Sequence, residues 1–218
     1  MSAVTQDYIE NYIRSLIKNR DSSLIYMEEY ARQNHVPIIQ KDSANLLEFF
    51  ITLLRPKKIL ELGTAIGYSS IIMSKCAGPN TKITTVERDE KLIQQASINI
   101  KNFGLENNIN ILQGDCLDIL KNLDGEFDII FMDAGKSHYK DYFPYCAGLL
   151  KEGGIIISDN VLFRGMVASD ELFKRRMVTI IKKMRKYLEM LSNNDEFITS
   201  VIPMGDGIAV TTRRNLNE

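Results

Sequence analysis

The chain has 218 residues, of which 44% are hydrophobic and 25% charged, and its formal net charge is −1. This composition is typical of a globular protein, and the length suits one α/β domain spanning residues 1–218. The near-neutral charge excludes nucleic-acid binding through bulk charge, so any such binding needs a local basic patch.

The three cysteines, Cys76, Cys116 and Cys146, are scattered along the chain and form no CxxC pair. They predict neither a zinc site nor a disulfide framework, and they favour a reducing, cytoplasmic location. No stretch approaches 18 unbroken apolar residues, and the N-terminus has no apolar signal-peptide core. We therefore expect no membrane span and no signal peptide.

Residues 1–55 predict a helical cap. In segment 4–17 apolar residues recur at helical spacing on one face; they are Val4, Tyr8, Ile9, Tyr12, Ile13 and Leu16. Segments 23–34 and 43–54 repeat this pattern, with an extended stretch at 35–42 between them. These helices carry more apolar surface than one side of a sheet requires, so we expect a homodimer.

From residue 56 to residue 218 the pattern is that of an α/β core. Short apolar runs occur at 57–62, 82–87, 108–114, 127–133 and 154–160. Helical stretches separate them, including 88–104 and 139–154, so the pattern predicts a Rossmann-like, mostly parallel sheet covered on both faces. Segment 197–214 contains two further strand-like runs joined by a Gly-Asp-Gly turn. It predicts an antiparallel hairpin at the sheet edge, which makes seven strands in all.

Each of the five apolar runs is closed by an acidic residue. These residues are Glu61, Glu87, Asp115, Asp133 and Asp159. One such acid is more often a helix cap than a ligand. In an open α/β sheet, however, ligands bind at the carboxyl ends of the strands, and five acids there favour a polar ligand or a cation.

Residues 59–70 predict a strand, a glycine-rich turn and the start of a helix. Gly63 and Gly67 allow a tight turn and a close approach of the backbone to a ligand. Glu87 ends the next strand, where a carboxylate accepts hydrogen bonds from ribose hydroxyls. The G-x-G-x-x-G spacing of dinucleotide sites is absent, so the turn by itself is a weak signal.

Asp133 and the pair Asp159-Asn160 follow two strands of the predicted sheet. Neighbouring strands lie about 4.8 Å apart, so these oxygens can converge on one cation, for which Mg²⁺ is the natural choice. The structural alternative is that Asp159 and Asn160 form only a turn. Lys136 follows Asp133 by three residues, and a cation nearby is expected to depress its pKa and suit it as a general base. The alternative is a surface lysine in the first turn of a helix, and His138 carries no clear chemical signal.

Six ordered motifs carry a family resemblance: ILELGTAIGYSS, TTVERD, GDCLDIL, FDIIFMDAGKSHY, GGIIISDNVLFRG and PMGDGIAV. From about residue 38 to residue 212, the chain resembles the class I S-adenosylmethionine-dependent O-methyltransferases, and most closely the metal-dependent branch that includes catechol and caffeoyl-CoA O-methyltransferases. The resemblance implies Mg²⁺ or Mn²⁺ on Asp133, Asp159 and Asn160, with Lys136 as the base and Asp133 also near the sulfonium or amino end of the cofactor. The remaining cofactor contacts that it implies are Ile38, Glu61, Gly63, Ser69, Glu87, Asp115 and Cys116.

Segment 174–188 contains seven basic residues and no acidic one, and without them the rest of the chain has a charge of −1 − 7 = −8. With an apolar stripe at Met177, Ile180, Ile181, Met184 and Leu188, it predicts an amphipathic helix with a cationic face. Such a face is typical of phosphate binding, although a solvated surface is the alternative. The RNA-binding residues that it predicts are Arg164, Lys174, Arg175, Arg176, Lys182 and Lys183.

The chain is also similar to bacterial tRNA 5-hydroxyuridine methyltransferases, which implies tRNA as the acceptor and 5-methoxyuridine at the wobble position as the product. Two alternatives stay open. One is a small-molecule catechol-type O-methyltransferase, because a catechol has the same pair of adjacent oxygens. The other is a non-catalytic RNA-binding protein, against which the intact set Asp133, Lys136, Asp159 and Asn160 argues.

Overall fold

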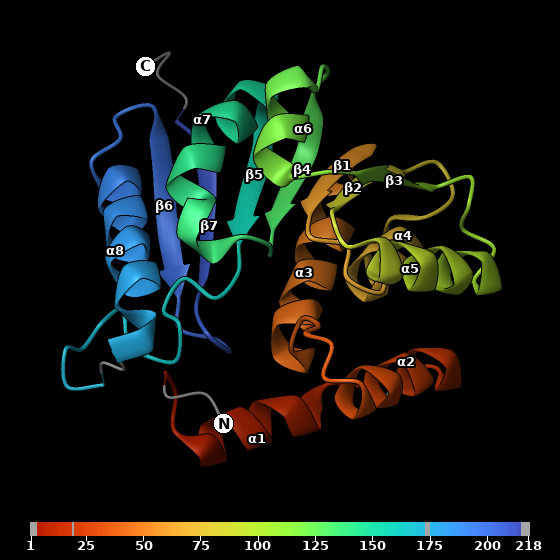
Figure 1. Cartoon of the computed structure of the whole chain (residues 1–218), viewed down its shortest axis with the longest axis horizontal. Helices are drawn as coiled ribbons and strands as arrows, with labels where there is room; N and C mark the ends of the chain where they lie inside the picture. Colours follow the sequence, from red (N-terminus) through yellow and green to blue (C-terminus); the bar gives the residue numbers. More distant parts are fainter. Residues whose placement is uncertain (1–3, 19, 173–174, 215–218) are drawn as a thin grey trace.

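The computed structural model describes residues 4–18, 20–172 and 175–214, and one seven-stranded sheet forms its centre (Figure 1). The strand order is β3-β2-β1-β4-β5-β7-β6. The strands are β1 Lys58–Leu62, β2 Lys82–Glu87, β3 Ile109–Gln113, β4 Phe127–Met132, β5 Leu150–Ser158, β6 Phe197–Ile202 and β7 Ile208–Arg213. β1 to β5 are parallel, while β7 runs antiparallel to both β5 and β6. The predicted fold and its edge hairpin are confirmed.

Three helices precede β1, and the others lie in connections between the strands. The helices are α1 Asp7–Leu16, α2 Ser22–Gln33, α3 Lys41–Leu54, α4 Tyr68–Ala77, α5 Glu90–Asn102, α6 Cys116–Asn122, α7 Tyr139–Leu149 and α8 Val178–Ser192, with short 3₁₀ helices η1 Lys136–His138 and η2 Arg175–Met177. The predicted helical stretch 139–154 is too long, because the chain enters β5 at Leu150. Gly154 lies there against the β4 backbone, where a Cβ atom would come within 2.8 Å of the Asp128 carbonyl oxygen.

The core has two layers because successive strand residues point to opposite faces of the sheet. Ile59 and its neighbour Ile129 pack beneath the helices α2 to α5. Leu60 and Ile130, one position later, pack against α6, α7 and α8. All four are fully buried, so the central strands are covered on both sides as the continuous apolar runs predict.

α8 is amphipathic, as expected, although its buried stripe is shifted from the prediction. Ile181 and Met184 are buried, and Tyr187 and Leu191 join them, whereas Met177, Ile180 and Leu188 are only half-buried. The shift arises because α8 also covers the base of the hairpin, where Phe197 packs.

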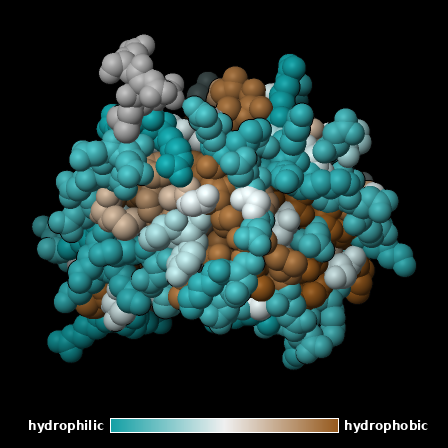
Figure 2. Space-filling model, turned by 90° about the horizontal axis from the view of Figure 1, so that it is seen from above, coloured by the Kyte–Doolittle hydropathy of each residue, from teal (hydrophilic) through white to brown (hydrophobic). Residues whose placement is uncertain are grey.

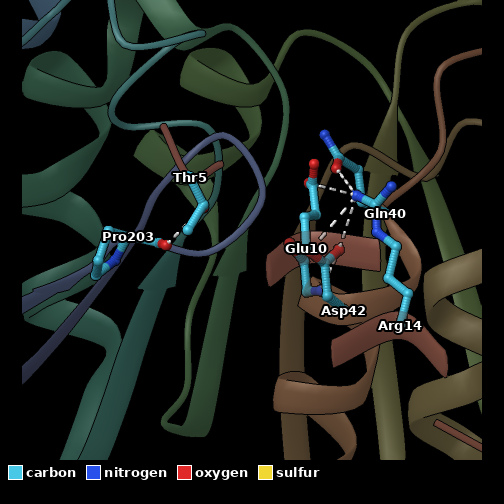
Figure 3. Close-up of polar contacts among 7 residues, drawn as sticks. Thr5, Glu10, Arg14, Gln40, Asp42 and Pro203 are labelled. Carbon is cyan, nitrogen blue, oxygen red and sulfur yellow. Dashed lines mark hydrogen bonds and ion pairs between the residues drawn. The ribbon is translucent and has the colours of Figure 1, made fainter. Parts of the chain in front are cut away.

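α1 rests on the rest of the molecule through polar contacts (Figure 3). The Arg14 guanidinium donates through Nη2 to Gln40 Oε1 at 2.5 Å and Glu10 Oε1 at 2.7 Å, and lies 3.3 Å from Asp42 Oδ1. Most of the predicted apolar face of α1 is exposed, with Tyr8 at 69% and Tyr12 and Leu16 at 65%, whereas Val4 and Ile13 are half-buried.

The surface is largely hydrophilic, with hydrophobic side chains showing between the hydrophilic ones in the view from above (Figure 2). Among the helices of the described chain, none has the length and apolar character needed to cross a membrane.

Candidate functional site

A cavity of about 630 Å³ opens at the carboxyl ends of the parallel strands. Its wall includes ten of the residues predicted from the sequence: Ile38, Gly63, Glu87, Asp115, Cys116, Asp133, Lys136, Asp159, Asn160 and Arg164. The sheet topology brings these distant residues together, because parallel strands deliver their ends to one edge.

One wall of the cavity is built around Glu87, the last residue of β2. Its carboxylate accepts from the backbone N–H groups of Ala65 at 3.0 Å, Arg88 at 2.9 Å and Asp89 at 3.0 Å. These three bonds fix both oxygens in place while each oxygen keeps acceptor capacity for a ligand hydroxyl. The arrangement suits recognition of a ribose diol.

The floor next to Glu87 depends on a glycine. Gly63 has φ +110°, and a Cβ atom there would lie 2.8 Å from Ala134 Cβ. Any larger residue would both strain the turn and close the space between the ends of β1 and β4. The space at this point therefore depends on two small residues, Gly63 and Ala134.

Glu61 and Ser69 lie just beneath the cavity wall, and their contact with a cofactor stays a prediction. Glu61 is fully buried and accepts hydrogen bonds from Ser69 Oγ at 2.5 Å, from Thr85 Oγ1 at 2.6 Å and from the Ser70 hydroxyl. Burial raises the pKa of Glu61 to about 7, although the three hydroxyls oppose the shift. This network joins β1, β2 and the first turn of α4 under the glycine-rich turn.

Asp115 and Cys116 sit at the start of α6. Asp115 caps the helix by accepting from the Leu117 N–H at 2.9 Å, as the capping alternative supposes, and its carboxylate also lies 3.8 Å from the Arg88 guanidinium. Burial raises the pKa of the Cys116 thiol to about 12, so this side chain offers a neutral surface to the cavity.

The opposite end of the cavity holds two carboxylates on adjacent strands. Met132 and Ser158 are register partners, so Asp133 and Asp159 follow β4 and β5 side by side, and the Asp159 N–H donates to the Met132 carbonyl at 3.0 Å. Burial, together with the charge of Asp133, raises the pKa of Asp159 to about 8. Burial also raises the pKa of Asp133, and Lys136 Nζ, 3.7 Å away, opposes that shift.

The carboxylates of Asp133 and Asp159 share one site, and burial disfavours the charged form of each. A divalent cation would fit there, since it would stabilise both charged forms. The amide of Asn160 lines the same end of the cavity. Within the described ranges, no three His, Cys, Asp or Glu side chains lie close enough to hold a metal by themselves. Asp133, Asp159 and Asn160 are therefore the set that could hold one.

Lys136 begins η1 directly after a glycine hinge. Gly135 has φ +66°, and a Cβ atom there would collide with the Tyr142 hydroxyl, so only glycine fits. The hinge turns Lys136 back toward Asp133, with 29% of its side chain exposed. His138 also lines the cavity, but its Nδ1 lies 3.2 Å from Asp141 Oδ2 on the outside of the helix.

The sequence analysis missed several lining residues, and Asp206 is the most informative. It lies in the Gly-Asp-Gly turn between β6 and β7, and its negative charge contributes to the raised pKa of Asp159. An acid in a hairpin turn gives no sign from sequence alone of which strand ends it will face. Gln40 and Phe163 line the cavity as well.

The predicted RNA-binding residues divide into two groups. Arg164 lines the cavity, whereas Arg175, Arg176, Lys182 and Lys183 are exposed outside it. Lys174 lies outside the described residues. η2 leads into α8, whose first turn lies at the end of the sheet where the strands deliver the cavity residues, and α8 packs against η1 (Figure 1).

A family model described as O-methyltransferase matches residues 20–214. A catechol O-methyltransferase from Niastella koreensis is 30% identical over 202 residues, which cover 90% of each chain. A Staphylococcus aureus structure assigned as a caffeoyl-CoA O-methyltransferase is 34% identical with a TM-score of 0.88, covering 95% of this chain and 100% of that one. The O-methyltransferase TomG from Streptomyces achromogenes, solved with S-adenosylmethionine, is 25% identical with a TM-score of 0.83, covering 95% and 96%.

Proposed function

We propose that this chain, which belongs to the S-adenosylmethionine-dependent O-methyltransferases of the caffeoyl-CoA and catechol type, methylates 5-hydroxyuridine at the tRNA wobble position. One observation carries the choice of tRNA. The exposed basic residues Arg175, Arg176, Lys182 and Lys183 lie on η2 and α8, next to η1 of the catalytic cavity.

The residues of the cavity divide the work of a methyl transfer. S-adenosylmethionine supplies a methyl group on a sulfonium, which is a strong electrophile. Glu87 accepts from the ribose, and the space left by Gly63 and Ala134 admits the reactive end of the cofactor. Such alignment of acceptor and methyl group provides much of the rate enhancement in this kind of reaction.

Lys136 takes the proton from the acceptor hydroxyl as its oxygen attacks the methyl carbon and S-adenosylhomocysteine leaves. A divalent cation, when bound by Asp133, Asp159 and Asn160, supplies positive charge that stabilises the acceptor oxyanion. Lys136 is placed for this role because it lines the same cavity as the acceptor oxygen would, and a cation bound by Asp133 would compete with the 3.7 Å ion pair between Lys136 Nζ and Asp133. The acceptor then needs two neighbouring oxygens, which 5-hydroxyuridine presents as its 5-hydroxyl and O4.

The second candidate function is methylation of a small catechol or caffeoyl compound. The names of the relatives favour it, and the same cavity would serve it. The tRNA proposal differs from the catechol proposal in its need for the basic face of α8, whereas a caffeoyl-CoA acceptor would bring phosphates of its own. A catechol has no phosphates for that face to bind, whereas the anticodon loop has several.

Charge reversal tests the tRNA proposal directly. Arg175→Glu with Arg176→Glu should weaken tRNA binding and reduce the salt slope of log K by roughly 0.7 for each phosphate of the single-stranded loop that the variant no longer neutralises. Lys101→Glu, in the last turn of α5, makes the same kind of charge change away from α8 and should leave the slope unchanged. Equal salt slopes for the wild type, the Arg175→Glu/Arg176→Glu variant and Lys101→Glu would show that the basic face is an ordinary solvated surface.

We also propose that the protein is a homodimer. The support is the exposed face of α1, on which Tyr8, Tyr12 and Leu16 recur at intervals of four residues. Tyr12→Glu with Leu16→Glu should give a monomer by sedimentation equilibrium if this face is the interface. A wild-type protein that sediments as a monomer across the working concentration range would exclude the proposal.

A further inference from the structure

The loop that follows β5 forms one wall of the cavity and is conformationally strained. Asn160, Phe163 and Arg164 all have positive φ angles, of +58°, +41° and +57°. Side chains other than glycine rarely adopt this region, and they keep it only where the surroundings hold them. All three residues line the cavity, so the strain lies where the acceptor would be recognised.

The first half of this loop is held by the turn between β6 and β7. The Val161 N–H donates to the Gly207 carbonyl at 2.9 Å, and the N–H groups of Leu162 and Phe163 donate to the Asp206 carbonyl at 2.9 and 3.1 Å. Gly207 is packed so closely against Leu162 that a Cβ atom there would collide with the leucine side chain. This side of the loop is therefore fixed.

The second half of the loop is held by Met166 and Val167, which are buried in the core beside α8, and by one polar side chain of that helix. Arg185 donates through Nε to the Val167 carbonyl at 2.8 Å, and its Nη2 lies 2.7 Å from Asp170 Oδ1. Ile181 and Met184, in the turn of α8 that precedes Arg185, are buried and fix the rotation of the helix. A guanidinium can bind two acceptors in different directions at once, which an ammonium on a flexible stem does poorly.

We infer that Arg185 is a positioning residue for the methyl transfer, which holds the second half of the 160–170 loop so that Arg164 keeps its place in the cavity, while the turn between β6 and β7 holds Asn160 and Phe163. By charge alone Arg185 would be grouped with the exposed basic residues of α8, but its role differs from theirs. The assignment of this wall to the acceptor rests on the proposed function, but the anchoring of the loop does not.

Hydrogen exchange tests the anchoring without any substrate. In Arg185→Ala, amides of residues 166–169 should exchange at least tenfold faster than in the wild type, while those of residues 161–163 and of strand β4 should be unchanged. Arg32→Ala is a matched control, because Arg32 also pairs with a carboxylate, Glu29, but lies on α2 outside the cavity wall. Unchanged exchange in Arg185→Ala would overturn the inference, whatever the acceptor is.

Kinetics then test the consequence for the reaction, with tRNA bearing 5-hydroxyuridine and with catechol. Arg185→Ala should lower kcat/KM for the acceptor that the wild type uses at least tenfold. The dissociation constant of S-adenosylhomocysteine, measured by calorimetry, should stay within twofold, because the Glu87 wall does not touch the loop. Arg185→Lys should recover only part of the activity, since lysine keeps the positive charge but lacks the planar guanidinium that binds two acceptors at once.

Three results would contradict this consequence. The first is an equal loss of acceptor and S-adenosylhomocysteine binding, which indicates general destabilisation. The second is full activity in Arg185→Lys, which indicates that charge alone matters. The third is a smaller salt slope of tRNA binding in Arg185→Ala, which would make Arg185 a phosphate-binding residue. If the wild type turns over neither acceptor, the proposed function fails, while the exchange result still decides whether Arg185 anchors the loop.

Discussion

Glu61 gives the molecule a pH dependence of stability whose size follows from its burial. Its pKa is raised from 4.5 to about 7 in the folded protein, because no water reaches the carboxylate. Between these two values the folded protein binds more protons than the unfolded chain, so the free energy of unfolding falls as the pH rises. At about 1.4 kcal/mol per pKa unit, the loss contributed by this group is about 3 kcal/mol.

Glu61→Gln mimics the protonated side chain and should remove this contribution. Urea unfolding of both proteins from pH 4.5 to pH 8, in EDTA so that metal binding does not intervene, measures it. The free energy of unfolding of the wild type should fall more steeply than that of Glu61→Gln up to about pH 7, and the two curves should run parallel above it. The comparison cancels the titration of Asp133 and Asp159, which both proteins share. Parallel curves throughout would refute the claim that Glu61 carries a buried, raised pKa.

The other predictions concern the site itself. Lys136→Ala should lower kcat by about 10²–10⁴-fold and leave S-adenosylhomocysteine binding, measured by calorimetry, unchanged. Lys136→Arg should be equally slow because arginine cannot accept the proton, so an active Lys136→Arg variant would exclude the base role. The substitution Asp159→Ala should abolish both methyl transfer and the Mg²⁺ binding that calorimetry measures. EDTA should do the same to the wild type, and added Mg²⁺ should restore the EDTA-treated wild type but not the variant. Full activity in EDTA would refute the metal site. Arg14→Ala should free Gln40 and raise the dissociation constant of S-adenosylhomocysteine several-fold, whereas a value equal to that of wild type would make α1 irrelevant to the cavity.

The architecture could be predicted from the sequence because its signals are local. Apolar runs of strand length, each closed by an acid, fix the parallel strands and the edge at which Asp133 and Asp159 meet. The glycines at positions 63 and 135 mark places where no Cβ atom fits, and both prove to shape the cavity.

The depth of a residue below the cavity could not be predicted in the same way. Glu61 closes an apolar run like the other acids, yet Ser69, Ser70 and Thr85 surround it in the layer beneath the wall. Its alternation with Leu62 in β1 indicates only that it points toward α4, and the distance to a ligand depends on how that helix packs. Asp206 shows the converse, because a turn acid reaches the cavity only once β7 pairs with β5.

Charge counting likewise could not distinguish Arg185 from its neighbours. Seven basic residues in fifteen positions indicate a cationic face, but Arg185 lies at its border with the buried stripe and bonds the loop at Val167. Only the path of the loop, which returns over α8 after β5, reveals this partner.

The central claim is that this cavity methylates a nucleoside hydroxyl in tRNA, and transfer of a labelled methyl group tests it most directly. Purified protein with Mg²⁺ and labelled S-adenosylmethionine should be offered tRNA that carries 5-hydroxyuridine, tRNA that lacks it, catechol and caffeate under identical conditions. We predict incorporation into the first substrate alone or far ahead of the others, with 5-methoxyuridine at the wobble position after digestion. Rapid methylation of catechol with no incorporation into tRNA would contradict the claim.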